Sequence, residues 1–309
     1  MPPAMRQSTL FARKAMQGVP DRSPSPTPRI LPSPTKNGTK GSSWKAKLTL
    51  VSVSGDDHFN FVCTWAIFLV GVCLCAELYE STAYGKFGTY SIVALNPRVG
   101  WWLMELPVTI SFLYFFFVKG GTQSQQPVPR LMAAIMCLHY SYRGWLFPFL
   151  IRSHKDSQFC IVPAVGGSLV TITHGYLNAK WFGEHGKHLN SEWLRNPRFL
   201  AGIFVYFSGL GLVLYHDHVI RSLRSFDPNT PRYSIPTGGF FDFVTCGQYL
   251  AELWCFTGFA LLSCGPNGLF IVLVSFVNLV PRAAQTTAWY HEKFGDEYPD
   301  RYHIFPGIY

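Results

Sequence analysis

Seven long apolar runs follow one another between residues 59 and 281, and they constrain the fold more than any other feature of the chain. Each approaches the roughly 20 residues that a helix needs to cross a hydrocarbon core about 30 Å thick. The runs are hydrophobic on all sides, which is typical of helices inside a membrane. We therefore predict an all-α polytopic membrane protein with a bundle of seven transmembrane helices. The runs are 59–79, 101–118, 131–151, 158–178, 199–216, 244–263 and 267–281.

The first 55 residues have a different composition. Residues 1–50 hold nine Lys and Arg, one acidic residue and many Pro, Ser and Thr, in a chain whose net charge is +9. Such a segment buries too little apolar surface to offset the entropy of ordering it, so we predict a disordered basic tail at 1–55. The remainder, 56–309, is predicted as the membrane domain. It is nearly neutral, which argues against nucleic acid as a partner and favours the lipid bilayer.

The eight cysteines form no Cys-x-x-Cys pair and fall mostly inside the apolar runs. We predict buried thiols rather than a disulfide framework or a metal site. The chain also lacks a P-loop, a Gly-x-Ser-x-Gly motif and a His-Glu-x-x-His motif. His185 and His188 lie in a polar loop and are expected to be solvated. No metal is predicted.

Polar residues interrupt the second and third apolar runs. Glu105 precedes Pro107, and His139, Tyr140 and Arg143 lie close together in the third run. An ionisable side chain inside a membrane costs roughly 2.5–3.5 kcal/mol, so its presence indicates a function. Pro107 loosens the helix beside Glu105, which suits a carboxyl group that faces a cavity. A structural pair of Glu105 with an Arg or His inside the bundle is an equally open alternative.

A second polar group follows the fifth run. On a continuing helix, Asp217, Arg221 and Arg224 would share one face, where two guanidinium groups and a carboxylate can hold a phosphate and a ribose. Contact with lipid head groups is the alternative. Gln248 and Glu252 are one helical turn apart in the sixth run, which places an amide beside a carboxylate.

The loops between the runs carry unequal positive charge. Those on the side of the C-terminus hold ten Lys and Arg, and those on the opposite side hold six. Because cytosolic loops are enriched in Lys and Arg, this bias predicts a cytosolic C-terminus. The basic tail favours the opposite orientation, but its effect is weaker because most of its charges are far from the first run.

Taken in order, these residues resemble the steroid 5-alpha-reductase family, in the branch that reduces 3-oxo-4-ene steroids. The resemblance begins at Tyr84-Gly85-Lys86 and runs to Tyr309. It implies a seven-helix, multi-pass enzyme of the endoplasmic reticulum membrane whose active site opens to the cytosol. Such an enzyme transfers hydride from NADPH to the C4–C5 double bond of a steroid or sterol enone. The other anchors are Glu105-Leu106-Pro107, His139-Tyr140 with Arg143, Asp217 with Arg221 and Arg224, Ile235-Pro236 with Gly238-Gly239-Phe240-Phe241, Glu252, and Trp289-Tyr290 with Tyr298-Pro299.

By the same resemblance, Glu105 and Tyr140 would be the catalytic pair that binds the substrate ketone. Hydride addition to the β-carbon of an enone puts negative charge on the carbonyl oxygen, and a phenol held by a carboxyl group can stabilise that charge. Ten further residues would line the NADPH site, whose phosphates call for several arginines. They are Arg143, Arg152, Asp217, Arg221, Arg224, Tyr233, Gln248, Glu252, Arg282 and Tyr290.

Four positions depart from the residues usual in that family. Met104 stands for a Gln, Val213 for an Asn, Gln248 for an Asn and Thr286 for a His. These changes remove or alter polar groups near the cofactor, so the affinity for NADPH is open. A reductase of enoyl-CoA or polyprenol substrates and a non-catalytic lipid-binding membrane protein remain the alternatives. A transporter is disfavoured because the sequence shows no internal repeat.

Overall fold

The computed structural model describes residues 49–79, 93–153, 157–224, 231 and 233–309. The predicted disordered tail, as far as residue 48, and the anchor Tyr84-Gly85-Lys86 lie outside the described residues. Almost all regular structure in the described part is helical, as predicted. The exception is one antiparallel pair of short strands, β1 (Ala94–Leu95) and β2 (Phe159–Cys160), in which Ala94 pairs with Cys160 and Leu95 with Phe159.

Seven helical segments make up the described chain when consecutive helices are counted together. Three of them continue from an α-helix into a wider π-helical turn. Three short 3₁₀ helices, η3 (Thr122–Gln125), η6 (Trp193–Arg195) and η7 (Gly239–Asp242), lie outside these segments, and a fourth, η8 (Gly295–Glu297), directly continues α9. The segments are α2 (Asp57–Tyr79), α3 (Pro97–Leu113) with η2 (Tyr114–Val118), α4 (Pro127–Tyr140) with η4 (Ser141–Leu146) and α5 (Phe147–Leu150), α6 (Ile161–Lys180) with η5 (Trp181–His185), α7 (Pro197–Ser222), α8 (Gly247–Ser263) and α9 (Pro266–Phe294).

Four of these segments are long and apolar enough to cross a membrane. They are Asp57–Tyr79, Pro97–Val118, Pro197–Ser222 and Pro266–Glu297. Large apolar side chains such as Ile67, Phe68 and Phe204 are more than half exposed. This is expected where lipid covers the surface. The protein is a multi-pass membrane protein, and the runs at 131–151, 158–178 and 244–263 form shorter or more polar helices.

Caps in the sequence set where two helices begin. The sequence Asn-Pro-Arg occurs at Asn96 and again at Asn196, each time just before a helix. The Asn side chain accepts a hydrogen bond at 2.9 Å from the backbone N–H of the Arg, and Pro takes the first helical position, where its missing N–H costs nothing. These motifs therefore fix the starts of α3 and α7.

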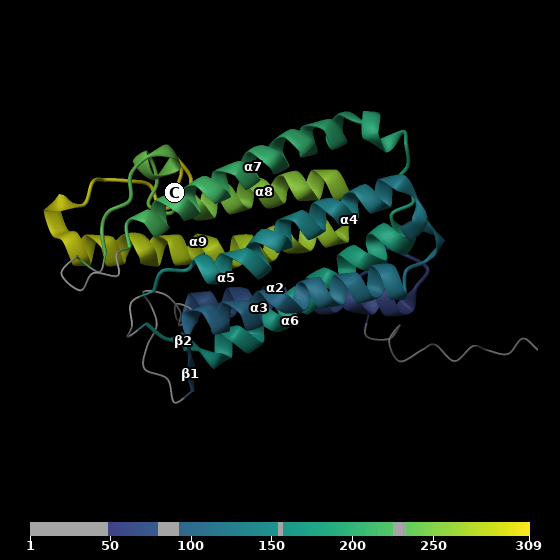
Figure 1. The fold of residues 1–309 in the computed structure, drawn as a ribbon, viewed down its shortest axis with the longest axis horizontal. Helices are drawn as coiled ribbons and strands as arrows, with labels where there is room; N and C mark the ends of the chain where they lie inside the picture. The colour runs from purple at the N-terminus through teal and green to yellow at the C-terminus, as the bar shows by residue number, and fades with distance from the viewer. Residues whose placement is uncertain (1–48, 80–92, 154–156, 225–230, 232) are drawn as a thin grey trace, which may run out of the picture. The chain divides into compact units, whose positions relative to one another are not determined.

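Glycines allow the closest helix contacts. A Cβ at Gly209 of α7 would lie 2.5 Å from the backbone of Cys255 in α8, and a Cβ at Gly175 of α6 would lie 2.5 Å from the carbonyl of Val108 in α3. Small residues are typical of tight helix pairs in membranes. Figure 1 shows the result, with α7, α8 and α9 in one group and α2, α3 and α6 in another, joined where α9 packs on α2 and α6.

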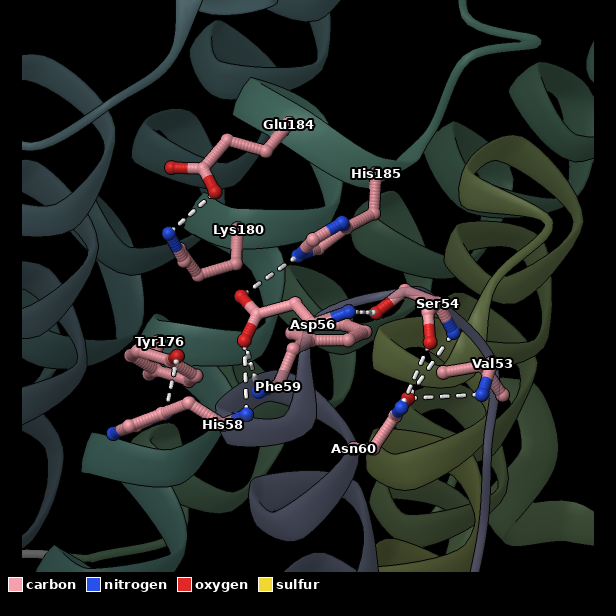
Figure 2. A network of polar contacts seen from close by, with 10 residues as sticks. All are labelled: Val53, Ser54, Asp56, His58, Phe59, Asn60, Tyr176, Lys180, Glu184 and His185. Atoms are coloured by element: carbon pink, nitrogen blue, oxygen red, sulfur yellow. Dashed lines mark hydrogen bonds and ion pairs between the residues drawn. The ribbon is translucent and has the colours of Figure 1, made fainter. Parts of the chain in front are cut away.

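One end of the α2–α6 pair is tied by polar contacts, which Figure 2 shows. Asp56 accepts hydrogen bonds from the N–H groups of His58 and Phe59, which caps α2, and its second oxygen lies 3.7 Å from Nε2 of His185. Lys180 pairs with Glu184 beside them. We call this set, together with Asn60 and Tyr176, the Asp56 network.

The expectation that His185 and His188 are solvated is wrong. The His185 ring lies 4.3 Å from the ring of Phe59, and its side chain is 14% exposed. His188 contacts the Trp193 ring at 4.6 Å and makes a 3.2 Å hydrogen bond with the carbonyl of Ser263. Aromatic residues therefore cover both rings. All eight cysteines are free, as predicted, but Cys75 and Cys264 are exposed rather than buried.

Candidate functional site

A cavity of about 1260 Å³ lies among the seven helical segments. Small-molecule sites usually measure about 300–1,000 Å³, so this cavity has room for more than one small ligand. The structure brings all twelve predicted site residues to its wall, together with the departing positions Met104, Val213 and Thr286. The twelve are Glu105, Tyr140, Arg143, Arg152, Asp217, Arg221, Arg224, Tyr233, Gln248, Glu252, Arg282 and Tyr290.

Glu105 and Tyr140 come from neighbouring helices. Glu105 lies in the middle of α3, and Tyr140 is the last residue of α4, where the helix widens into the π-helical η4. Gly144 of η4 packs against the backbone of Glu105, so the two segments approach closely at this level. Both side chains line the same cavity. The predicted pair therefore faces one compartment rather than two.

Arg143 is the centre of the buried charges. Its Nη2 lies 3.3 Å from Glu252 of α8, and its Nη1 lies 3.7 Å from Asp217 of α7. The guanidinium also stacks on the rings of Trp101 and Phe147, at 5.0 and 5.1 Å. These partners hold Arg143 on every side. These contacts join α8 and α7 to η4, and Arg143 also lines the cavity.

Three arginines lie around the end of α7. Nη1 of Arg221 is buried and has no hydrogen-bond partner among the described residues, and its Nη2 is 3.5 Å from His218. α7 ends at Ser222, so Arg224 lies just past the helix, where it donates to the Arg152 carbonyl at 3.0 Å while Arg152 donates back at 3.5 Å. Three guanidinium groups therefore gather at one mouth of the cavity.

α8 and α9 form a further part of the cavity wall. Arg282 is 2% exposed, donates from Nε to the Tyr249 hydroxyl at 3.2 Å and lies 4.0 Å from the Glu77 carboxylate of α2. The side-chain oxygens of Gln248 and Thr286 are buried without a hydrogen-bond partner in the part of the chain that the structure describes. With the oxygen of Asn278, this wall thus presents one cation and three polar atoms that lack a hydrogen-bond partner among the described residues.

The glycine turn after Pro236 packs against the end of α7. Gly238 and Gly239 have φ angles of 92° and 59°, which favour glycine, and a Cβ on either would lie under 3.0 Å from the Tyr215 side chain. His216 accepts a 3.0 Å hydrogen bond from the N–H of Phe240 and fixes the turn. The turn therefore places α8, with Gln248 and Glu252, at the cavity.

The C-terminal residues close the same end. The Tyr298 hydroxyl donates to Thr245 at 2.7 Å, and the ring of Tyr290 stacks on that of Tyr298 with centroids 5.0 Å apart. His303 makes a 2.9 Å hydrogen bond with Thr287 of α9, and burial lowers the pKa of its imidazole. These contacts explain why the aromatic ending Trp289-Tyr290 with Tyr298-Pro299 belongs with the site.

Sequence reasoning missed Trp101 and Glu77, which line the cavity, and Tyr142, which contacts a cavity residue. Trp101 stacks on Arg143, the Tyr142 hydroxyl donates to Asp217 at 3.1 Å, and Glu77 pairs with Arg282. Glu77 and Asn278 each stand inside a predicted span, so a search for every polar residue in the apolar runs would have found both. The role of Trp101 has no such signal, because an indole in a span is ordinary.

The residues present fit a phosphate-bearing nucleotide cofactor. Five cavity residues, His139, Arg221, Gln248, Asn278 and Thr286, have a buried polar atom with no hydrogen-bond partner among the described residues. Such atoms are costly unless a ligand satisfies them. The arginines at the mouth supply the positive charge that phosphates require.

Comparison with known proteins identifies the family of this chain. A family model described as 3-oxo-5-alpha-steroid 4-dehydrogenase matches residues 157–309. The 3-oxo-5-alpha-steroid 4-dehydrogenase 1 of Rattus norvegicus is 30% identical over 244 residues, 78% of this chain and 92% of the rat protein. That of Mus musculus is 32% identical over 75% of this chain and 89% of the mouse protein. The steroid 5-alpha-reductase DET2 of Solanum lycopersicum is 28% identical over 83% of this chain and 99% of its own length. The chain belongs to the steroid 5-alpha-reductase (3-oxo-5-alpha-steroid 4-dehydrogenase) family.

Proposed function

We propose that this protein reduces the C4–C5 double bond of 3-oxo-4-ene steroids to give 5-alpha-3-oxosteroids, with NADPH as the reductant. The observation that carries this proposal is that Glu105 and Tyr140 share a cavity with the arginines of α7 and α9. An enone needs a hydrogen-bond donor at its ketone oxygen, and a phosphate-bearing reductant needs cations. This one cavity offers both kinds of group. The relatives are named 3-oxo-5-alpha-steroid 4-dehydrogenase and steroid 5-alpha-reductase, and these names support the same reaction.

In this mechanism Tyr140 donates a hydrogen bond to the ketone oxygen, and Glu105 orients the phenol. When bound, NADPH supplies the hydride that adds to C5, the β-carbon of the enone. Negative charge then develops on the ketone oxygen, where the Tyr140 hydroxyl is already placed to stabilise it. Water delivers the proton to C4. The apolar walls contributed by α2 and α6 keep other water from the reacting atoms.

Arg221, Arg224 and Arg152 would hold the phosphates of the cofactor, and Asp217 would orient a ribose hydroxyl. Gln248, Glu252, Arg282, Tyr233 and Tyr290 would complete that part of the cavity wall, with Arg143 positioning Asp217 and Glu252. The unpaired Nη1 of Arg221 and the unpaired oxygens of Gln248 and Thr286 support this division.

For the membrane we propose seven spanning helices, an endoplasmic reticulum location and a cavity mouth on the cytosolic side, where NADPH is available. The loop charges support a cytosolic C-terminus. We further propose residues 56–309 as the reductase domain and residues 1–55 as an appended tail. Glycosylation or protease sites introduced into the loops test the orientation.

The activity is tested with membranes that contain the expressed protein, NADPH and a panel of 4-en-3-one steroids. The expected product is the 5-alpha-3-oxosteroid, identified by chromatography against authentic standards. Enoyl-CoA and polyprenol substrates belong in the same panel, because turnover of those alone would replace the proposal. Purified protein that binds neither NADPH nor steroid would indicate a non-catalytic membrane protein.

A further inference from the structure

The proline inside α3 leaves one carbonyl of that helix without its usual partner. In an α-helix each carbonyl accepts from the N–H four residues further on, and for Leu103 that residue is Pro107, which has no N–H. Glu105 lies between the two, inside the turn that lacks the bond. α3 belongs to the candidate span Pro97–Val118, and inside hydrocarbon a free carbonyl finds no water to bond. The Leu103 carbonyl therefore needs a donor from another part of the protein.

Ser168 of α6 supplies that donor. Its hydroxyl oxygen lies 2.9 Å from the Leu103 carbonyl oxygen and 2.7 Å from the carbonyl oxygen of Ala164 in its own helix. A hydroxyl has one proton, so the two acceptors compete for it. The Ala164 carbonyl already has the backbone N–H of Ser168, four residues on in α6, whereas the Leu103 carbonyl has no such donor. The bond to Leu103 therefore gives the larger gain, because it satisfies an acceptor that is otherwise unpaired.

A second side chain of α6 holds the next carbonyl of α3. The Thr171 hydroxyl lies 2.8 Å from the Met104 carbonyl oxygen, closer than the 3.1 Å to the Ser168 carbonyl in its own helix. Ser168 and Thr171 are three residues apart and share one face of α6. Glu105 is the next residue of α3, and it lines the cavity with Tyr140. α6 thus fixes the backbone directly before Glu105.

We propose that Ser168 is a positioning residue for Glu105. This inference rests on the proposed function, in which Glu105 orients the phenol of Tyr140. Ser168 itself does not line the cavity, so a ligand in the cavity would not meet it. It acts through the Leu103 carbonyl, and that bond holds the turn opened by Pro107 in one conformation. Loss of the bond lets the turn relax, and the carboxyl of Glu105 moves with it.

Ser168→Ala tests this role with NADPH and a 4-en-3-one steroid at saturation. The variant is expected to lower kcat about tenfold, because a small displacement of a catalytic group has a large effect on the rate. NADPH affinity, measured by quenching of tryptophan fluorescence, should match wild type. Ser168→Thr keeps the hydroxyl and is expected to bring kcat to within about twofold of wild type. An unchanged kcat in Ser168→Ala would overturn the proposal.

The matched control is Ser111→Ala. Ser111 joins the same two helices, since its hydroxyl donates from α3 to the Ile172 carbonyl of α6 at 3.0 Å, but it lies beyond Pro107 and away from Glu105. The control is expected to keep the wild-type kcat. A fall as large as that in Ser168→Ala would show a general effect of loosening α3 from α6, and the specific role of Ser168 would be lost.

A second experiment isolates the N–H that Pro107 lacks. Pro107→Ala restores a backbone donor to the Leu103 carbonyl, so adding Ser168→Ala to it is expected to change kcat by less than about twofold. The thermal midpoint gives the same comparison without activity. Ser168→Ala should lower it by about 3 °C in the wild-type chain and leave it unchanged in Pro107→Ala. Equal losses in the two backgrounds would mean that the hydroxyl does not act through this carbonyl, which also overturns the proposal.

The outcomes separate this inference from the proposed function. If Ser168→Ala does not give folded protein, Ser168→Cys, a much weaker donor of similar size, takes its place in every comparison. A wild-type protein that reduces no enone contradicts the proposed function and with it the positioning role. The thermal midpoints then still decide whether Ser168 serves the Leu103 carbonyl. An active wild type with no selective loss in the Ser168 variants contradicts the positioning role alone.

Discussion

The cavity and the Asp56 network are both rich in polar side chains, but the two regions differ in how many of these side chains have a hydrogen-bond partner within the protein. In the Asp56 network the groups pair mainly with one another, as when Asn60 accepts hydrogen bonds from Val53 and Ser54 and the Tyr176 hydroxyl meets His58 at 2.9 Å (Figure 2). In the cavity, Gln248, Asn278 and Thr286 keep a buried atom without such a partner among the described residues. In the Asp56 network one buried atom, Nε2 of His185, lacks a hydrogen bond among the described residues, and it still lies 3.7 Å from Asp56. We call the first set of contacts closed and the second open.

The difference follows from the energetics of buried polar groups. A buried group left without a partner costs about 1–3 kcal/mol, whereas a paired group contributes modestly to stability. A chain keeps several open groups in one place only where a ligand completes them. We therefore expect changes in the closed contacts to alter stability, and changes in the cavity to alter binding and turnover.

The largest effect is expected at the proposed catalytic pair. Tyr140→Phe removes the hydrogen-bond donor to the ketone oxygen, and Glu105→Gln removes the carboxylate that orients it. Each is expected to lower kcat by about 10²–10³-fold, measured by product formation with saturating NADPH. The thermal midpoint and NADPH affinity serve as controls and should change little. Full turnover in both variants would contradict the assigned roles.

The next largest effect is expected in a closed buried contact. Asn178 of α6 is fully buried, donates to the His174 carbonyl at 2.8 Å and accepts from Asn267 of α9 at 2.7 Å. Asn178→Ala leaves the Asn267 amide unpaired and is expected to cost about 2 kcal/mol of unfolding free energy, measured by denaturant titration in detergent. The KM for steroid should stay within about twofold of wild type, given the size of a typical hydrogen-bond contribution. A large change in KM with intact stability would mean that the two regions are coupled.

Much of the site was visible in the sequence because a polar residue in an apolar run stands out. Glu105 and Glu252 were found in this way. The contact of Glu252 with Arg143 was not found, because the two residues are 109 positions apart in the sequence. The packing of α7 on α8 depends on Gly209, whose role cannot be seen until the partner helix is known. The π-helical turn after Tyr140 also has no sequence signal, since it answers to packing rather than propensity.

The error at His185 and His188 has a related cause. Loop polarity says nothing about which distant rings cover a side chain, and Phe59 and Trp193 come from other parts of the chain. The contacts of Arg143 also could not be read from the sequence. Two carboxylates and two rings surround its guanidinium, and they come from different parts of the chain. Its predicted place at the NADPH site stays a prediction.

A smaller effect is expected at the open mouth of the cavity. Arg221→Ala removes a guanidinium whose Nη1 lacks a protein partner, so it is expected to weaken NADPH binding about tenfold and to reduce the preference for NADPH over NADH. Fluorescence titration with each cofactor measures both. The matched control is Arg198→Ala, at the opposite end of α7, where neither affinity should change. Equal binding of NADPH and NADH by wild type would remove the argument for a 2′-phosphate contact.

The smallest effect is expected from two matched helix caps, which compare the two regions directly. Asp56→Ala removes the cap of α2 in the Asp56 network, and Asn96→Ala removes the cap of α3, whose first turns carry the cavity residue Trp101. Each is expected to cost about 1 kcal/mol of unfolding free energy, because the same kind of N-terminal hydrogen bond is lost. Only Asn96→Ala should also raise the KM for NADPH or steroid, since loosening the start of α3 moves Trp101 away from Arg143. Denaturant titration and steady-state kinetics on the same preparations separate the two outcomes. If Asp56→Ala raised KM as much as Asn96→Ala, the closed network would be part of the binding machinery, and the division between a stabilising end and a ligand-binding end would be wrong.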